Sequence, residues 1–214
     1  EGEGAMADLA GKTILVTGAS RGIGAAIAVG AAATGARVIV HSTGPGAAIS
    51  KIAEGIAAPA GDVLYEDLAA PGAGFRLFEK ALASASRIDG VVNNAGVFID
   101  SLLLSTEEAW TDSWAKMHAV NVQAPADISY SAIKHFRASA GGIVVNIASR
   151  AGHRGDSIDG AAYAASKGAL LAMTKTFARQ LAPENMLFYA IAPGWVETRM
   201  APKDIEARTK ALSE

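Results

Sequence analysis

Residues 17–24 read Thr-Gly-Ala-Ser-Arg-Gly-Ile-Gly, and they join a short apolar run to a long Ala-rich segment. The glycines of this stretch have separate mechanical uses in a strand-to-helix turn. Gly18 permits the sharp turn out of the strand, Gly22 lets the backbone approach a diphosphate, and Gly24 lets helix and strand pack closely. The N–H groups at the start of the following helix would face the anion. The stretch therefore predicts a phosphate-binding turn, with a tight turn that binds nothing as the alternative.

Outward from this turn, short apolar runs alternate with longer Ala-rich stretches. The predicted strands are residues 12–17, 37–41, 63–66, 90–93, 142–147 and 186–191. Near-continuous apolar strands separated by helices are typical of a parallel sheet that helices cover on both faces. The sequence therefore predicts an α/β fold: a doubly wound parallel sheet in a single Rossmann-type domain over residues 8–214. Such sheets bind ligands beyond the carboxyl ends of their strands.

Two segments depart from this alternation. Residues 44–61 are rich in Gly and Ala and contain two prolines, so we expect a shortened helix with irregular flanks. Residues 1–7 are acidic and Gly-rich, which predicts a segment left over from cloning, or a disordered start, rather than a secretion signal.

Composition excludes several classes of function. A chain of 214 residues that is 50% hydrophobic can bury one substantial core, and a net charge of -2 without blocks of like charge makes nucleic acid an unfavourable partner. The absence of cysteine rules out disulfides and thiolate metal sites and suits a cytoplasmic protein. No apolar run approaches the roughly 18 residues of a membrane span. We assign no metal site.

The end of the second predicted strand bears on which dinucleotide is bound. It reads His41-Ser42-Thr43, without the carboxylate that would hydrogen-bond the ribose of NAD and repel a 2′-phosphate. Arg21 in the turn could offer paired donors to that phosphate. These features favour NADP, with NAD as the alternative. A solvated Arg21 and a merely polar strand end would also account for them.

Tyr163 and Lys167 are four residues apart in a helical stretch, so both side chains project from one face. A nearby cation favours the phenolate and lowers the tyrosine pKa from its ordinary value of about 10. The spacing therefore predicts a pair that exchanges protons, while a surface pair on an amphipathic helix is the alternative.

Further motifs occur in order along the chain, each at the end of a predicted strand or on a predicted helix: Asn93-Asn94-Ala95-Gly96, Asn121, Ser149, Tyr163-Ala164-Ala165-Ser166-Lys167 and Pro193-Gly194. With the glycine turn, they make residues 12 to about 200 resemble the short-chain dehydrogenase/reductase family, including its 3-oxoacyl-[acyl-carrier-protein] reductases. The resemblance implies hydride transfer between NADP(H) and a ketone or secondary alcohol, with a 3-oxoacyl thioester as one candidate substrate. The competing interpretation is a non-catalytic dinucleotide-binding scaffold or sensor.

The same resemblance assigns roles at the reaction centre. Tyr163 would be the general acid in reduction and the general base in oxidation, and Lys167 would also hold the nicotinamide ribose. Ser149 would hydrogen-bond the substrate oxygen as charge develops on it. Asn121 would complete a proton relay by holding a water near the lysine.

The sequence around Asn121 offers a physical reason for this assignment. Pro125 follows four residues later and has no N–H, so in a helix the carbonyl of Asn121 would lose its partner and the helix would kink. A proline that bends the helix only for packing is the alternative.

The resemblance also implies cofactor contacts along the carboxyl ends of the strands. These are Gly18, Ser20, Arg21, Gly22, Ile23, Gly24, Ser42, Asp67, Leu68, Asn94, Ala95, Gly96, Tyr163, Lys167, Pro193, Gly194, Val196 and Thr198. Asp67 and Leu68 would lie near the adenine. Asp62 is a rival for that role, and Asp67 could equally cap a helix or turn.

Small side chains recur at helical spacing along the Tyr163 helix, at Ala161, Ala165, Gly168, Ala169 and Ala172. They permit the close approach of another helix, and by resemblance we expect a homodimer or homotetramer. Residues 203–214 resemble the start of a loop that covers the substrate in relatives. We therefore expect this chain to lack the last helix and the last strand of the family.

Overall fold

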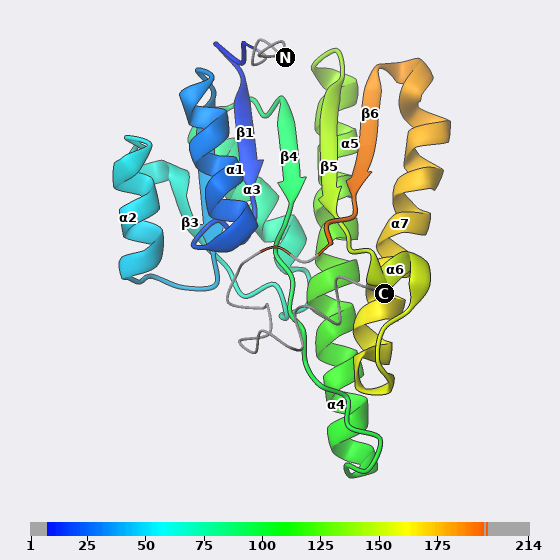
Figure 1. Cartoon of the computed structure of the whole chain (residues 1–214). Coiled ribbons are helices and arrows are strands. Elements are labelled where there is room, and N and C mark those ends of the chain that lie inside the picture. The colour runs from blue at the N-terminus through cyan, green and yellow to red at the C-terminus, as the bar shows by residue number, and fades with distance from the viewer. Residues whose placement is uncertain (1–7, 195, 197–214) are drawn as a thin grey trace, which may run out of the picture.

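The computed structural model describes residues 8–194 and residue 196, so the expectations for residues 1–7, Thr198 and 203–214 lie outside the described residues. Six parallel strands form one sheet in the order β3-β2-β1-β4-β5-β6 (Figure 1). The strands are β1 Thr13–Val16, β2 Arg37–Ser42, β3 Val63–Tyr65, β4 Gly90–Asn93, β5 Gly142–Ile147 and β6 Met186–Ile191. The predicted doubly wound parallel sheet is confirmed, and its strand order reverses between β1 and β4.

The predicted strands agree with these bounds to within one residue at each end. The agreement follows from burial, because a strand covered on both faces must be apolar along its whole length. All four residues of β4 are buried, as are the last five of β2. Alternate residues of each strand therefore enter two different cores.

The described helices are α1 Gly22–Ala33, α2 Ala47–Gly55, α3 Ala73–Ala85, α4 Glu107–His118, α5 Ala124–Ala138, α6 Ala151–Arg154 and α7 Ala161–Leu181. Shorter turns are η1 Ala60–Asp62, η2 Ala119–Gln123, η3 Ile158–Gly160 and η4 Ala182–Glu184. The short helix expected within residues 44–61 is confirmed as α2. No helix in the described part of the chain combines the length and apolarity needed to cross a membrane.

The helices cover the sheet on both faces (Figure 1). Leu15 and Val91 point into a core with residues of α3, α5 and the end of α7. Their neighbours Val16 and Val92 point into a second core with residues of α1 and α2. Because all six strands are parallel, their carboxyl ends lie at one common edge of the sheet.

The second face is covered less completely beyond β4. Ile143 of β5 and Tyr189 and Ile191 of β6 lie on the same face as α1 and α2, and they are 42%, 52% and 52% exposed. On the opposite face, Val144 and Phe188 are buried against the helices.

An ion pair fixes the outer edge of the sheet at β2 and β3. Arg37 donates from Nε and Nη2 to the two carboxylate oxygens of Asp62, each at 2.8 Å, and Ser84 Oγ donates to Asp62 Oδ1. Burial opposes ionisation of Asp62, but the hydrogen bonds from Arg37 and Ser84 outweigh it and hold the pKa of this carboxyl below its ordinary value. The pair therefore stabilises the fold when Asp62 is ionised.

We predict that Asp62→Asn lowers the free energy of unfolding at pH 7 by about 1–3 kcal/mol, because Arg37 loses its charged acceptor. Since the pKa of Asp62 is lower in the folded chain, this stabilisation is complete above about pH 5 and is lost as the pH falls through the folded value. Urea unfolding at pH 7 and pH 3 measures the difference. Asp112→Asn, at an exposed position on α4, is the matched control. An equal difference at both pH values would contradict the assignment.

Candidate active site

The turn between β1 and α1 has the geometry that its glycines predict. Gly18 and Gly22 have φ values of +63° and +56°, which favour glycine. A Cβ on Gly18 would lie 2.8 Å from the Cα of Ala95, and one on Gly24 would overlap Asn94 Nδ2 and the carbonyl oxygen of Gly18. Arg21 precedes α1, and no side chain caps this helix. The helix N-terminus and the close-packed backbone therefore fit a bound diphosphate.

Thr17 connects this turn to the end of β4. Its Oγ1 accepts hydrogen bonds from the N–H groups of Asn94 and Ala95, both at 3.0 Å. Asn94 Nδ2 donates in return to the carbonyl oxygens of Thr17 and Gly18, at 2.9 and 3.1 Å. The predicted residues Asn94, Ala95 and Gly18 thus lie together at the reversal of strand order. Thr17 itself was not among the predicted site residues.

The end of β2 carries no carboxylate. Ser42 is buried and its hydroxyl donates to the carbonyl oxygen of Gly44 at 2.7 Å, whereas Arg21 is exposed at the turn. The side chains of Ser20 and Ile23 are half-buried in the same turn.

The two aspartates that compete for the adenine role lie on opposite sides of β3, Asp62 before the strand and Asp67 after it. Asp62 is engaged by Arg37 and is fully buried, so it is not available to a ligand. Asp67 is exposed, and its Oδ1 accepts from the N–H of Ala69 at 3.0 Å, so it caps a turn. Leu68 is 5% exposed and packs in the core with α3 and α5. The expected place of Leu68 near the adenine stays a prediction, and with the side chain in the core it would rest on the Leu68 backbone.

The four predicted catalytic residues are brought together beyond the ends of β4 and β5. Tyr163 and Lys167 lie one turn apart on α7, with Lys167 Nζ 5.8 Å from the centre of the Tyr163 ring. Ser149 follows β5 and hydrogen-bonds Tyr163. Asn121 lies in η2 and donates to Ser166 of α7 at 3.0 Å.

The pKa of Tyr163 moves opposite to the sequence-based expectation. Burial raises it above its ordinary value, Asp156 adds to the increase, and the hydrogen bond with Ser149 only partly opposes it. Lys167 is not among the groups that shift it. Lys167 is itself buried, which lowers its pKa to about 8.

Lys167 retains donors for a ligand. Within residues 8–194 and 196, its recorded hydrogen-bond partner is the carbonyl oxygen of Ile147, at 2.8 Å from Nζ. An ammonium group has three donors, so two remain. A Cβ on Gly96 would lie 3.4 Å from this Nζ, so the absence of a side chain keeps the approach open. The arrangement fits the hydroxyl groups of a bound ribose.

Asn121 lies where the helix departs from α geometry. Residues Ala119–Gln123 form a π turn, and Pro125 in the first turn of α5 has no N–H to offer the Asn121 carbonyl. The Asn121 side chain is occupied: Oδ1 accepts from the N–H of Val97 and Nδ2 donates to the Val97 carbonyl, both at 2.9 Å. The side chain therefore braces the loop after β4, and only its backbone carbonyl is left for the relay expected from the sequence.

Phe98 is a site residue that sequence reasoning missed. Its ring meets the ring of Tyr163 edge to face, with the centres 5.1 Å apart. It follows Gly96 by two residues, so its position after a strand end was the available signal. Pro193, Gly194 and Val196 follow β6, and the Pro193 carbonyl accepts from the N–H of Arg150 at 3.2 Å, beside Ser149.

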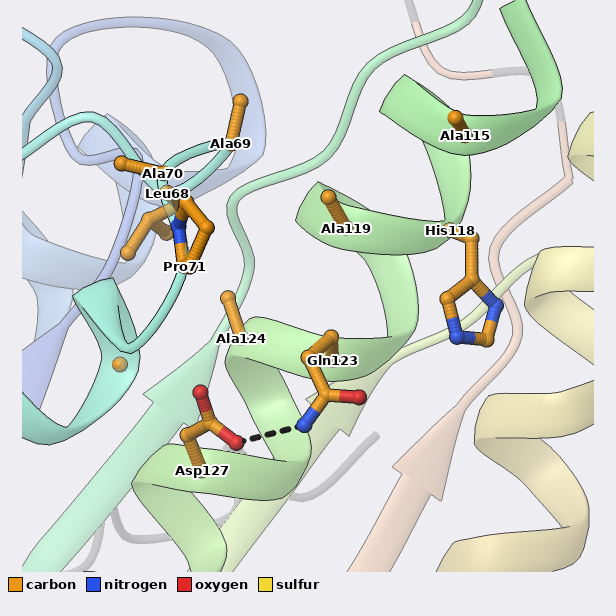
Figure 2. A pocket seen from close by; sticks show the side chains of 11 residues that line it. Leu68, Ala69, Ala70, Pro71, Ala115, His118, Ala119, Gln123, Ala124 and Asp127 are labelled. Carbon is orange, nitrogen blue, oxygen red and sulfur yellow. Dashed lines mark hydrogen bonds between the residues drawn. The ribbon is translucent and has the colours of Figure 1, made fainter. Parts of the chain in front are cut away.

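A pocket of about 320 Å³ lies apart from this cluster, between the loop after β3 and α4, η2 and α5 (Figure 2). It is lined mainly by small apolar side chains, including Ala69, Ala115 and Ala119. At one end Gln123 Nε2 donates to Asp127 Oδ1 at 2.7 Å. None of the four predicted catalytic residues lines it, whereas Leu68, one of the residues predicted to lie near the adenine, does.

Residues 12–209 match the family described as short chain dehydrogenase. A 3-oxoacyl-[acyl-carrier-protein] reductase from Synechocystis is 34% identical over 91% of this chain and 78% of its own length. A structure of 3-oxoacyl (acyl-carrier-protein) reductase from Agrobacterium tumefaciens with NADP bound has a TM-score of 0.81, with 36% identity over 96% of this chain and 77% of that one. A Pseudomonas aeruginosa RhlG/NADP complex gives 0.82, with 32% identity over 96% and 80%.

Proposed function

This chain belongs to the short-chain dehydrogenase family and is an oxidoreductase, and on that premise we propose that it reduces a ketone to a secondary alcohol with NADPH, or catalyses the reverse oxidation. The observation that carries the proposal is the convergence of Ser149, Tyr163, Lys167 and Asn121 beside a glycine turn shaped for a diphosphate. A scaffold without activity would not need a buried lysine next to a half-buried tyrosine, because burying an ionisable group is costly.

The residues of the chain divide the chemistry as follows. The nicotinamide, when bound, supplies or accepts the hydride. In reduction, Tyr163 donates its proton to the carbonyl oxygen, and its raised pKa keeps it protonated at neutral pH. Ser149, which is hydrogen-bonded to Tyr163, also donates to that oxygen as negative charge develops. Lys167 holds the ribose hydroxyls, and the Asn121 carbonyl holds the water that returns a proton.

Two features support NADP as the cofactor. Structures similar to this chain contain NADP. In the chain itself, the end of β2 offers Ser42 in place of a carboxylate, and Arg21 is exposed at the adjoining turn. An arginine can donate paired hydrogen bonds to the oxygens of a 2′-phosphate, whereas a ribose hydroxyl offers a single oxygen.

A 3-oxoacyl thioester is the substrate class that we propose. Relatives named as 3-oxoacyl-[acyl-carrier-protein] reductases are similar over most of their length. The loop after β4 presents exposed apolar side chains, namely Phe98, Leu102 and Leu103, and the ring of Phe98 contacts that of Tyr163. Hydrogen bonds from the N–H groups of Ser101 and Leu103 to Asp159 anchor this loop just before α7. An acyl chain would bury this apolar surface.

We predict that Tyr163→Phe lowers kcat for a 3-oxoacyl thioester about 10²- to 10⁴-fold, because the general acid is removed. NADPH affinity should change less than about threefold, since the phenyl ring keeps its contact with Phe98. NADPH oxidation followed at 340 nm measures turnover, and isothermal titration measures binding. Tyr130→Phe, at an exposed position on α5, is the matched control. Undiminished turnover in the Tyr163 variant would contradict this mechanism, and dinucleotide binding without turnover in the wild type would favour the scaffold.

We predict that Arg21→Ala raises the KM for NADPH about 10- to 100-fold and leaves the KM for NADH within about threefold, because charge-assisted hydrogen bonds to the 2′-phosphate are lost. Initial rates measured with each cofactor give the two KM values for the variant and for the wild type. Arg179→Ala, on the exposed side of α7, controls for loss of positive charge. A parallel rise for both cofactors would show that Arg21 does not read the 2′-phosphate.

We further propose a homo-oligomer in which α7 packs against a second copy. Ala165, Ala169 and Ala172 form an exposed row of small side chains on this helix, which allows close approach of another helix.

Analytical ultracentrifugation at micromolar concentration should therefore show a dimer or tetramer. Ala169→Arg should shift the distribution toward monomer, because a long charged side chain separates the helices. The control Ala26→Arg, on the exposed side of α1, should leave the distribution unchanged. A wild type that sediments only as monomer would overturn this prediction.

A further inference from the structure

His41 is a buried histidine that joins three segments at the carboxyl edge of the sheet. It lies near the end of β2 and is 2% exposed. Its Nδ1 accepts a hydrogen bond from the N–H of Gly18 at 3.2 Å, and its Nε2 lies 2.9 Å from the carbonyl oxygen of Glu66. Its own backbone carbonyl accepts from the N–H of Ala19 at 2.8 Å. One residue thus connects the glycine turn after β1 to the loop after β3.

These partners determine the form of the imidazole. The Gly18 N–H can only donate and the Glu66 carbonyl can only accept, so the ring is neutral and carries its proton on Nε2. A second proton, on Nδ1, would make this nitrogen a donor, and it would then face the N–H of Gly18, which is also a donor. Protonation therefore breaks the contact with the turn while leaving the contact with Glu66 in place.

The surroundings of His41 shift its pKa in both directions. Burial lowers its pKa, the hydrogen bond to Glu66 and the Glu66 carboxylate raise it, and Lys80 of α3 lowers it. Glu66 is also paired with Arg76 of α3 at 2.7 Å. In the turn itself Arg21 is the charged residue, and α1 contains none. Neutral His41 is thus the prevailing form at neutral pH.

We propose that His41 is a positioning residue for the dinucleotide: its neutral ring holds the turn at Gly18 and Ala19 in register with the loop that carries Asp67, and its protonation weakens dinucleotide binding. The inference rests on the proposed function, because it assigns the turn and the loop to the two ends of the adenosine diphosphate. His41 acts through the backbone of Gly18.

Two substitutions separate this role from simple packing. His41→Leu keeps an apolar side chain of similar volume but leaves the Gly18 N–H and the Glu66 carbonyl without a partner. A buried backbone group in the binding turn that loses its hydrogen-bond partner should lower the dinucleotide affinity about tenfold. His41→Asn places an amide oxygen at the position of Nδ1, so it restores the acceptor for Gly18, and this oxygen does not titrate.

Isothermal titration with NADP⁺ between pH 4.5 and 8 tests the proposal without a turnover assay. At pH 7.5 the Kd should rise about tenfold in His41→Leu and stay within about threefold in His41→Asn. As the pH falls, the Kd of the wild type should rise relative to that of His41→Asn. The 2′-phosphate titrates near pH 6, but it does so equally for every variant, so the ratio of Kd values isolates His41. His118→Asn, an exposed histidine on α4, should follow the wild type.

A ratio of wild-type to His41→Asn Kd that stays constant across this pH range would overturn the proposal, as would an unchanged Kd in a folded His41→Leu. If circular dichroism shows that His41→Leu does not fold, the pH ratio decides alone. A wild type that binds no dinucleotide at all overturns the proposed function, and this inference with it. Dinucleotide binding by the wild type without the pH-dependent ratio overturns only the role of His41.

Discussion

Thr17 Oγ1 holds the ends of β1 and β4 together, and the rest of the site depends on this contact. In this doubly wound parallel sheet the strand order reverses between β1 and β4, and the loops on the two sides of the reversal leave in opposite directions. Here the hydroxyl of Thr17 accepts hydrogen bonds from the N–H groups of Asn94 and Ala95. The side-chain amide of Asn94 donates two hydrogen bonds to backbone carbonyls of the turn. The backbone can approach a ligand on both sides because Gly18 and Gly96 flank this junction.

Around the junction, buried polar side chains are used mainly to position backbone. His41 fixes Gly18, Asn121 fixes Val97, and both do so with side-chain atoms whose hydrogen bonds are satisfied. Lys167 is different, because its Nζ contacts one carbonyl and retains donors. The site thus combines a hydrogen-bonded frame with one cation that retains donors for a ligand.

The sequence was most informative where one physical requirement dominates. Strands buried on both faces must be apolar throughout, so their bounds could be predicted to within one residue. The glycine turn could be recognised because only glycine fits at positions 18 and 24. The strand-end position of Leu68 does not reveal that its side chain packs into the core. The pKa direction for Tyr163 was wrong because spacing predicts proximity to Lys167 but not how deeply both groups are buried. His41 was recognised only as a polar strand end, since its partners are backbone atoms 23 and 25 residues away.

The π turn at Ala119–Gln123 has a consequence for how the chain can vary in length. A π turn contains one residue more than an α-helical path between the same two points. Deleting a residue here would allow continuous α-helix between these points, but the residues kept within the turn would change their angular position by up to about 100°. Asn121 would then no longer face both Val97 and Ser166. Insertions and deletions are therefore tolerated far less at this bend than in the surface loops, although a helix would still form.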